Sequence, residues 1–220
     1  GTSVLLREDG PLGPLVEREF RLLFSGSLVS LLGTAVAPIA LAFAVLDLTG
    51  SKTDLGLVLT ANWVPQVILV LFGGVFADRL ARNLVMVGSN LVSGAAQATI
   101  AALLLTHHAE LWQLIAIQVV RGSAMAFFFP ASQGLVPETV RPSLLQQANA
   151  LLGMTKNGTI ILGAALGGVL VATAGSGWAL AFDGATYVAS AAVLAAMHLP
   201  RASTVGTPSF MHELAQGWSE

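Results

Sequence analysis

The sequence predicts an all-α membrane protein with six transmembrane helices, and three observations support this fold class. Hydrophobic residues make up 55% of the 220 residues and charged residues only 10%, whereas soluble domains carry about 25% charged residues. The apolar residues gather in six runs, each about as long as the roughly 20 residues that a helix needs to cross a bilayer. Short polar stretches separate the runs, which makes neighbouring helices antiparallel.

The six expected helices form one bundle, and the rest of the chain flanks it. We expect the helices over residues 22–46, 55–76, 84–105, 111–135, 148–174 and 178–199. The transmembrane bundle therefore occupies residues 22–199. Residues 1–21 are expected to form a cytoplasmic N-terminal segment, and residues 200–220 to begin a cytoplasmic linker.

Basic residues set the expected orientation, because short cytoplasmic loops retain Lys and Arg. Lys52 lies on one side of the bundle, whereas the other side carries Arg7, Arg18, Arg21, Arg79, Arg82, Arg141 and Arg201. Both ends of the chain are therefore predicted to be cytoplasmic, and the protein to be a multi-pass protein of the cell membrane.

Residues 137–147 interrupt the apolar pattern between the fourth and fifth helices. The stretch is polar apart from Leu144 and Leu145, which predicts a short amphipathic helix along the inner surface of the membrane. The tail, residues 201–220, has a similar amphipathic end. An irregular solvated linker is the alternative, and for the tail we give the two interpretations equal weight.

Composition argues against several classes of function. The formal net charge is −2 and no basic stripe is present, so nucleic acid is not an expected partner. The chain has no cysteine and its four histidines lack the spacing of zinc ligands, so we expect no metal and no cofactor. The sequence contains no nucleophile triad, phosphate-binding loop or dinucleotide fingerprint, so an enzyme is not expected.

A compact charged turn between the second and third helices is the most informative stretch. It reads Gly74-Val75-Phe76-Ala77-Asp78-Arg79-Leu80-Ala81-Arg82. A glycine at its start lets a neighbouring backbone approach closely, and Asp78 is placed to pair with a base or with the positive N-terminus of another helix. Arg79 and Arg82 are expected to hold the turn at the headgroups. A positive-inside loop with one incidental acid is the plain alternative.

Arg121 lies near the middle of the fourth predicted helix. Insertion scales put the cost of an arginine at the centre of a membrane helix at about 2.5–3.5 kcal/mol, so such residues normally face a cavity or a partner. Gln118 lies one turn away on the same face. These two residues predict a polar stripe that faces a substrate or proton pathway.

Other polar residues inside the predicted helices are candidates for the same pathway: Asn62 and Gln66 in the second helix, Lys156 in the fifth, and Asp183 with Tyr187 in the sixth. Asp183 is the carboxylate that lies clearly within a predicted span. It is a candidate for binding a proton, and neutralising an arginine or lysine is the alternative. A further polar face on the third helix, made of Asn90, Ser93 and Gln97, is expected to form interhelical hydrogen bonds.

The fifth helix contains a cluster of glycines at Gly163, Gly167 and Gly168. Small residues four apart let two membrane helices pack closely. We interpret Gly163 and Gly167 as a packing seam, which by itself explains their presence.

The charged turn resembles the signature of the major facilitator superfamily, in which a glycine, three residues, Asp-Arg, two residues and Arg follow the second helix. The match includes Gly74, Asp78, Arg79 and Arg82, and it departs at Ala81 and Asn83, where the family has a glycine and a second base. Six residues in the second helix, 71–76, also echo residues 165–170 in the fifth, which is weak support for three-helix repeats.

The resemblance implies the N-terminal half of a twelve-helix transporter, built from two three-helix inverted repeats. The family's helix-four arginine corresponds to Arg121, a residue implicated there in proton coupling or substrate binding. The glycines of the fifth helix are similar to an exporter motif, with Ala164 in place of its proline. Residues 127–131 and 147–150 resemble the bacterial branch that contains macrolide-efflux proteins and the enterobactin exporter.

The expected function is therefore secondary active transport by alternating access between this half and a C-terminal six-helix half. A proton-coupled exporter of a small amphipathic molecule, such as a drug, a macrolide or a siderophore, is the leading hypothesis. An importer or facilitator of the same fold is one alternative. A non-transporting membrane scaffold, in which the polar residues only hold helices together, is the other.

Overall fold

The computed structural model describes residues 12–77 and 81–198, with the surroundings of side chains for 12–70 and 81–198. This part of the chain contains helices and no strand. Six of the helices are long and apolar enough to cross a membrane, and the protein is a multi-pass membrane protein. The elements in order are η1 (Gly13–Val16), α2 (Arg18–Thr49), α3 (Lys52–Ala77), α4 (Arg82–Leu105), α5 (Leu111–Thr139), η2 (Pro142–Leu144), α6 (Leu145–Ala174) and α7 (Ser176–Ala195).

The six predicted transmembrane helices are confirmed, with small shifts at their ends. The first begins at Arg18 rather than at residue 22, and the last ends at Ala195 rather than at residue 199. Gly50 closes α2 with a φ of 66°, a left-handed conformation that glycine adopts without strain. Residues 201–220 lie outside the described part of the chain.

The predicted surface helix at residues 137–147 is wrong. α5 continues through Pro137 to Thr139, and after η2 the next transmembrane helix begins at once at Leu145. Val136, Val140 and Leu144 are 2%, 8% and 5% exposed and belong to a core cluster. The apolar residues of this stretch turn inward and bury against the bundle, so they do not lie on a membrane surface.

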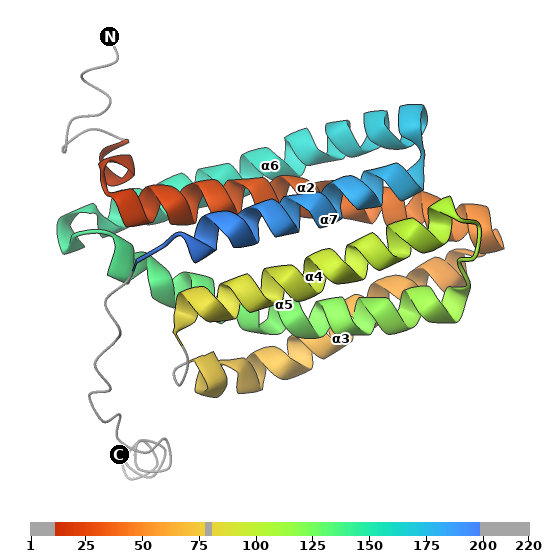
Figure 1. Ribbon diagram of the computed structural model, residues 1–220, viewed down its shortest axis with the longest axis horizontal. Helices are drawn as coiled ribbons and strands as arrows, with labels where there is room; N and C mark the ends of the chain where they lie inside the picture. The colour runs from red at the N-terminus through yellow and green to blue at the C-terminus, as the bar shows by residue number, and fades with distance from the viewer. Residues whose placement is uncertain (1–11, 78–80, 199–220) are drawn as a thin grey trace.

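The helices pack in the pattern of two inverted three-helix repeats. The first helix of each triplet, α2 or α5, packs against the second and third helices of the other triplet, and the third helices α4 and α7 pack against each other. This exchange is what a two-fold axis in the membrane plane produces. The second helices, α3 and α6, lie on opposite flanks of the bundle (Figure 1).

The two flanking helices expose large apolar side chains. On α3 these are Trp63, Val64, Val67 and Ile68, and on α6 they are Met154, Ile161, Leu162 and Val169. The faces of α4 and α7 that meet in the bundle contain many buried residues instead. The flanks at α3 and α6 are therefore available to lipid or to further protein.

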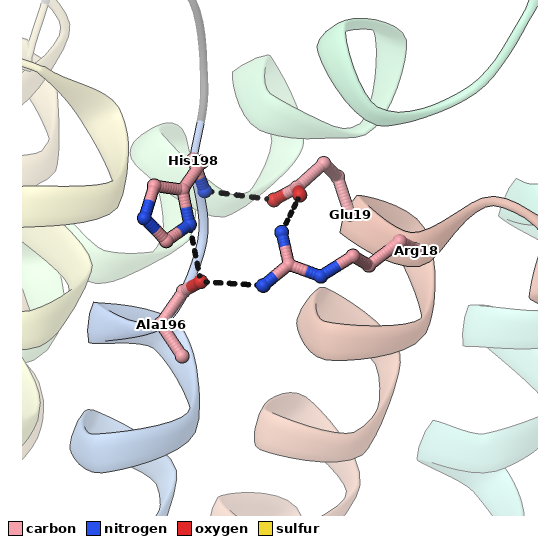
Figure 2. Close-up of polar contacts among 4 residues, drawn as sticks. All are labelled: Arg18, Glu19, Ala196 and His198. Atoms are coloured by element: carbon pink, nitrogen blue, oxygen red, sulfur yellow. Dashed lines mark hydrogen bonds and ion pairs between the residues drawn. The ribbon is translucent and has the colours of Figure 1, made fainter.

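The first and last helices are joined at one end of the bundle, which we call the basic end because Arg18, Arg82 and Arg141 lie there. Arg18 Nη2 donates to the carbonyl of Ala196 at 3.5 Å, and Glu19 Oε2 accepts from the backbone N–H of His198 at 3.0 Å. Figure 2 shows how these four residues lie together. Arg18 and Glu19 also form an ion pair at 2.8 Å. These bonds satisfy groups at the C-terminal end of α7 that have no partner within the helix.

Candidate functional site

A cavity of about 340 Å³ opens between α2, α3 and α5. Its polar wall is formed by Thr34, Asn62, Gln66, Gln118 and Arg121, and its apolar wall by Ala37, Pro38, Leu41, Leu59, Trp63, Met125 and Phe129. The volume lies within the roughly 300–1,000 Å³ of small-molecule sites, and the mixture of aromatic walls with a few polar groups is also typical of them. Four of the residues predicted for the pathway, Asn62, Gln66, Gln118 and Arg121, meet in this cavity.

Arg121 is the charged residue of the cavity, and it is only 8% exposed. Its Nη2 donates to the hydroxyl of Tyr187 on α7 at 3.0 Å, and its guanidinium carbon lies 5.8 Å from the centre of the Tyr187 ring. The Tyr187 hydroxyl also bonds to Thr34 Oγ1 on α2 at 2.9 Å. Arg121 Nε has no hydrogen-bond partner among the described residues. The guanidinium is thus oriented from one side while part of its donor capacity is unused.

Asn62 joins α3 to α5 beside Arg121. Its Nδ2 donates to Gln118 Oε1 at 3.2 Å, and in the opposite amide orientation its oxygen accepts from Arg121 Nη1 and from the backbone N–H of Gly122, each at 3.3 Å. Gly122 permits this approach, because a Cβ there would lie 2.0 Å from the carbonyl oxygen of Asn62. A glycine in α5 therefore brings the amide of α3 up to the cavity.

Asp183 lies outside the cavity lining, in a separate layer between α7, α4 and α2. It is fully buried, and its Oδ2 accepts from Gln97 Nε2 of α4 at 2.5 Å. On α2, Gly33 meets it directly, since a Cβ at Gly33 would lie 2.6 Å from Asp183 Oδ1 and 1.9 Å from Thr186 Oγ1. The next residue of α2, Thr34, lines the cavity. One helix, α2, thus contacts both the carboxyl and the cavity at this level.

Lys156 also lies away from the cavity, on an exposed part of α6. Its backbone carbonyl accepts from Thr159 Oγ1 at 2.9 Å. The structure therefore does not bring Lys156 and Asp183 together with the four residues that share the cavity.

The glycines of α6 differ in what they contact. A Cβ at Gly163 would lie 2.2 Å from Ala35 Cβ, and one at Gly167 would lie 3.3 Å from the backbone of Val36, so both glycines face α2. Gly168 has open space around it. The small-residue contact between α6 and α2 is thus made by Gly163 and Gly167.

Arg82 reaches from the start of α4 across the end of α5. Its Nη1 donates to the carbonyl of Gly134 and pairs with Glu138 Oε1 at 2.9 Å. A side chain at Gly134 would collide with the guanidinium, because a Cβ would lie 2.6 Å from its central carbon. Arg82 therefore binds protein groups at the basic end. Asp78, Arg79 and the surroundings of Gly74 lie outside the described residues.

Sequence reasoning missed the aromatic side of the cavity. Trp63 is 61% exposed and Phe129 is 41% exposed, and both line the cavity beside Met125. Tryptophan favours the two membrane interfaces. A tryptophan in the middle of a predicted span, such as Trp63, was therefore a signal that this position does not simply face lipid. Thr34 carried no such signal, because a threonine in a helix commonly bonds its own backbone, as Thr34 also does with Ser30.

No group of three or more His, Cys, Asp or Glu in the described part of the chain is placed to hold a metal ion. The chemistry that the arrangement offers is binding: a charged donor, three amides and aromatic walls around a space of ligand size.

Comparisons with known proteins agree with this interpretation. A family model described as transmembrane secretion effector matches residues 9–218. Macrolide efflux protein A of Streptococcus pyogenes is 22% identical over 203 residues, which are 90% of this chain and 50% of that protein. The multidrug efflux pump Tap of Mycobacterium tuberculosis is 26% identical over 212 residues, 91% of this chain and 49% of that protein.

A third relative, the uncharacterized MFS-type transporter YfiS of Bacillus subtilis, is 31% identical over 132 residues, 60% of this chain and 30% of that protein. This chain spans half or less of the length of these curated relatives. All three relatives are described as transporters or efflux proteins and none as an enzyme.

Proposed function

Because this chain belongs to the transmembrane secretion effector family of major facilitator transporters, we propose that it is the N-terminal half of a secondary active exporter. The match to about half of a longer relative's length and the six-helix inverted repeat support this proposal. The partner is a C-terminal six-helix half, which packs against the flanks at α3 and α6. Transport then proceeds by rocking of the two halves around a central site.

The proposed location is a bacterial cell membrane, with the basic end of the bundle in the cytoplasm. Arg18, Arg82 and Arg141 gather at this end, as the retention of basic residues in cytoplasmic loops requires. Trp112 and Trp178 lie near the start of α5 and α7 at the opposite end and are 64% and 58% exposed. Tryptophans at that level fit the outer membrane interface.

The observation that carries the proposal is the cavity around Arg121. The Arg121 guanidinium lines this cavity together with Trp63 and Phe129, which suits a small amphipathic molecule that has a hydrogen-bond acceptor and an apolar body. The names of the efflux relatives support a drug or a macrolide as its class. In the assembled transporter this cavity forms one wall of the central site, and the second half supplies the other.

We expect export to be driven by the proton gradient, with the basic end acting as the inner gate. The contact of Arg82 with Gly134 and Glu138 closes the gap between α4 and α5 at that end. The predicted gate residues Gly74, Asp78 and Arg79 directly precede Arg82 in sequence. Opening this contact in one of the two access states is the expected role of the motif.

The test is efflux from cells that express the full-length parent protein. A panel of fluorescent dyes, macrolides and siderophores is loaded, and efflux is followed with and without a protonophore. Gradient-dependent loss of one compound supports an exporter and names its substrate class. Accumulation of a compound favours an importer, and no flux of any compound favours the scaffold alternative.

Arg121→Ala then tests the site. We expect it to abolish efflux of the identified compound while the protein still reaches the membrane, and Arg121→Lys to restore little, because a lysine lacks the planar pair of donors that Tyr187 and Asn62 engage. Arg18→Ala is the matched control, since that side chain is 57% exposed at the basic end. Unchanged efflux in Arg121→Ala would contradict the assignment of the cavity as the substrate site.

A further inference from the structure

A seam of buried polar side chains runs behind the substrate cavity, between α4, α7 and α2. It contains Asn90, Ser93 and Gln97 of α4, Asp183 and Ser190 of α7, and Ser27 of α2, all at most 6% exposed. Asn90 donates to Ser190 Oγ at 2.8 Å and Gln97 donates to Asp183. Five side-chain atoms of the seam lack a hydrogen-bond partner among the described residues, namely Ser27 Oγ, Asn90 Oδ1, Ser93 Oγ, Gln97 Oε1 and Asp183 Oδ1.

Asp183 is the titratable member of this seam. A buried carboxylate is stable when several donors or a cation hold both of its oxygens. Here Oδ2 has one amide donor, Gln97, and Oδ1 has no partner within the described chain. Neither form of the carboxyl is fully satisfied by these contacts, because a carboxylate leaves Oδ1 without a donor and a neutral carboxyl leaves an –OH at Oδ1 without an acceptor. The described contacts therefore do not fix the group in one protonation state.

From this arrangement we infer that Asp183 is the group that binds and releases the coupling proton. The inference rests on the proposed transport function and names the residue that performs its energy coupling. Proton binding forms the O–H bond of the Asp183 carboxyl, and release transfers that proton to water.

The charged surroundings of Asp183 link it to the cavity. On the elements packed against it, α2 presents Gly33 and α4 presents Gln97, and neither is charged. Tyr187 lies one turn along α7 and holds Arg121 of α5, which is the charged group that acts on Asp183 electrostatically. A change in the charge of Asp183 therefore acts on Arg121 in the wall of the cavity.

This electrostatic link predicts how protonation of Asp183 affects the binding of substrate in the cavity. When Asp183 is ionised, its charge offsets that of Arg121, and the wall beside Trp63 and Phe129 is close to neutral overall. When Asp183 is protonated, Arg121 is left as an uncompensated charge at the edge of an apolar cavity. A cationic amphipathic molecule prefers the first state, since electrostatic interactions are strong where water is excluded. Substrate and proton then exclude each other, which is the requirement for antiport.

The first test needs no substrate. The purified full-length transporter is titrated by infrared difference spectroscopy, which detects the C=O stretch of a protonated carboxyl. We expect a titrating carboxyl band in the wild-type protein, its loss in Asp183→Asn, and a frequency shift in Gln97→Ala, which removes the amide donor. Ser190→Ala, which breaks the neighbouring Asn90 bond in the same seam, is the matched control and should leave the band unchanged.

If Asp183→Asn does not fold, Gln97→Ala serves as the test. Loss of the Gln97 amide should shift the infrared band of Asp183 and should not shift the band of any other carboxyl. Retention of the band in Asp183→Asn, or an unshifted band in Gln97→Ala, would overturn the inference. These outcomes are independent of transport, so they separate a failure of the inference from a failure of the proposed function.

The second test uses proteoliposomes and the compound that the efflux panel identifies. We expect Asp183→Asn to retain exchange of labelled for unlabelled compound and to lose accumulation driven by a pH gradient by about tenfold or more. Ser190→Ala should retain both. Accumulation by Asp183→Asn at the wild-type level, or driving by a sodium gradient in place of a pH gradient, would contradict the assignment of a proton to Asp183.

Discussion

The bundle places two groups of polar side chains on the two sides of α2, and they differ in how they are used. On the cavity side, Asn62, Gln66, Gln118 and Arg121 stand beside open space and exposed aromatic rings. On the packed side, Asn90, Gln97, Asp183 and Ser190 are fully buried and bond across helix interfaces. Composition does not separate the two groups, because each contains at least two amides and one ionisable residue. What separates them is whether a neighbouring helix or a cavity faces the side chain.

Substitutions in the two groups should therefore affect different properties of the protein. A change on the packed side disturbs helix contact, and so it should act on stability. A change on the cavity side should act on ligand binding and leave stability nearly intact.

Gly33→Ala should have the largest effect on the packed side. The new methyl group would lie 1.9 Å from Thr186 Oγ1 and 2.6 Å from Asp183 Oδ1, and overpacking of this kind costs about 1–3 kcal/mol. We expect a lower thermal midpoint and reduced yield of the purified full-length protein. The control is Gly88→Ala on α4, where nothing lies within 4 Å of the added group. Equal midpoints for the two variants would contradict the close packing of α2 on α7.

Trp63→Ala and Phe129→Ala should act on the cavity side alone. Both rings line the cavity and are partly exposed, so their loss removes contact with a ligand and little helix packing within these six helices. We expect roughly tenfold weaker apparent affinity for the exported compound, about 1.4 kcal/mol, and a nearly unchanged thermal midpoint. Trp112→Ala, at an exposed position outside the cavity lining, is the control. A large decrease in thermal midpoint with unchanged affinity would show that these rings stabilise helix packing and do not contact the ligand.

Asn90→Ala should have a moderate effect on stability and none on substrate affinity. It removes the 2.8 Å bond to Ser190 across the α4–α7 interface, and such bonds in membrane proteins contribute about 0.6 kcal/mol. Thermal unfolding of the full-length protein measures the first effect, and the efflux assay measures the second. A changed substrate profile would show that the seam contacts the substrate directly.

Glu17→Gln should have the smallest effect. The ion pair of Glu17 with Arg141 at 2.9 Å lies at the basic end, with side chains that are 34% and 50% exposed. Exposed pairs contribute about 0–1 kcal/mol and weaken with salt. We expect a change in midpoint close to the error of the measurement, and none at high salt. A decrease in thermal midpoint comparable to that of Gly33→Ala would show that this ion pair stabilises the fold more than its exposure predicts.

Much of the fold followed from the sequence, because hydrophobic length is a strong constraint in a membrane. The six spans and their antiparallel order came from that signal. The stretch at residues 137–147 did not, since its polar residues concealed the inward-facing Val140 and Leu144. Polarity averaged over a short stretch does not say which side of the backbone is buried.

The candidate site was predicted in part for a similar reason. Arg121 and Gln118 share a helix face, so their meeting in one cavity follows from spacing within a single helix. The separation of Asp183 from that cavity depends on the rotation of α7 against α2, which is set by the fit of Gly33 against Asp183 and Thr186. Contacts between helices distant in sequence leave no periodic trace in a single chain.

The junction of Arg18 and Glu19 with Ala196 and His198 also has a mechanical consequence (Figure 2). His198 lies beside the first turn of α2, so any pull on the chain at this residue is shared by the two helices that meet there. Because α2 and α7 also pack along their length, such a load would act on both helices together and would not peel α7 from α2.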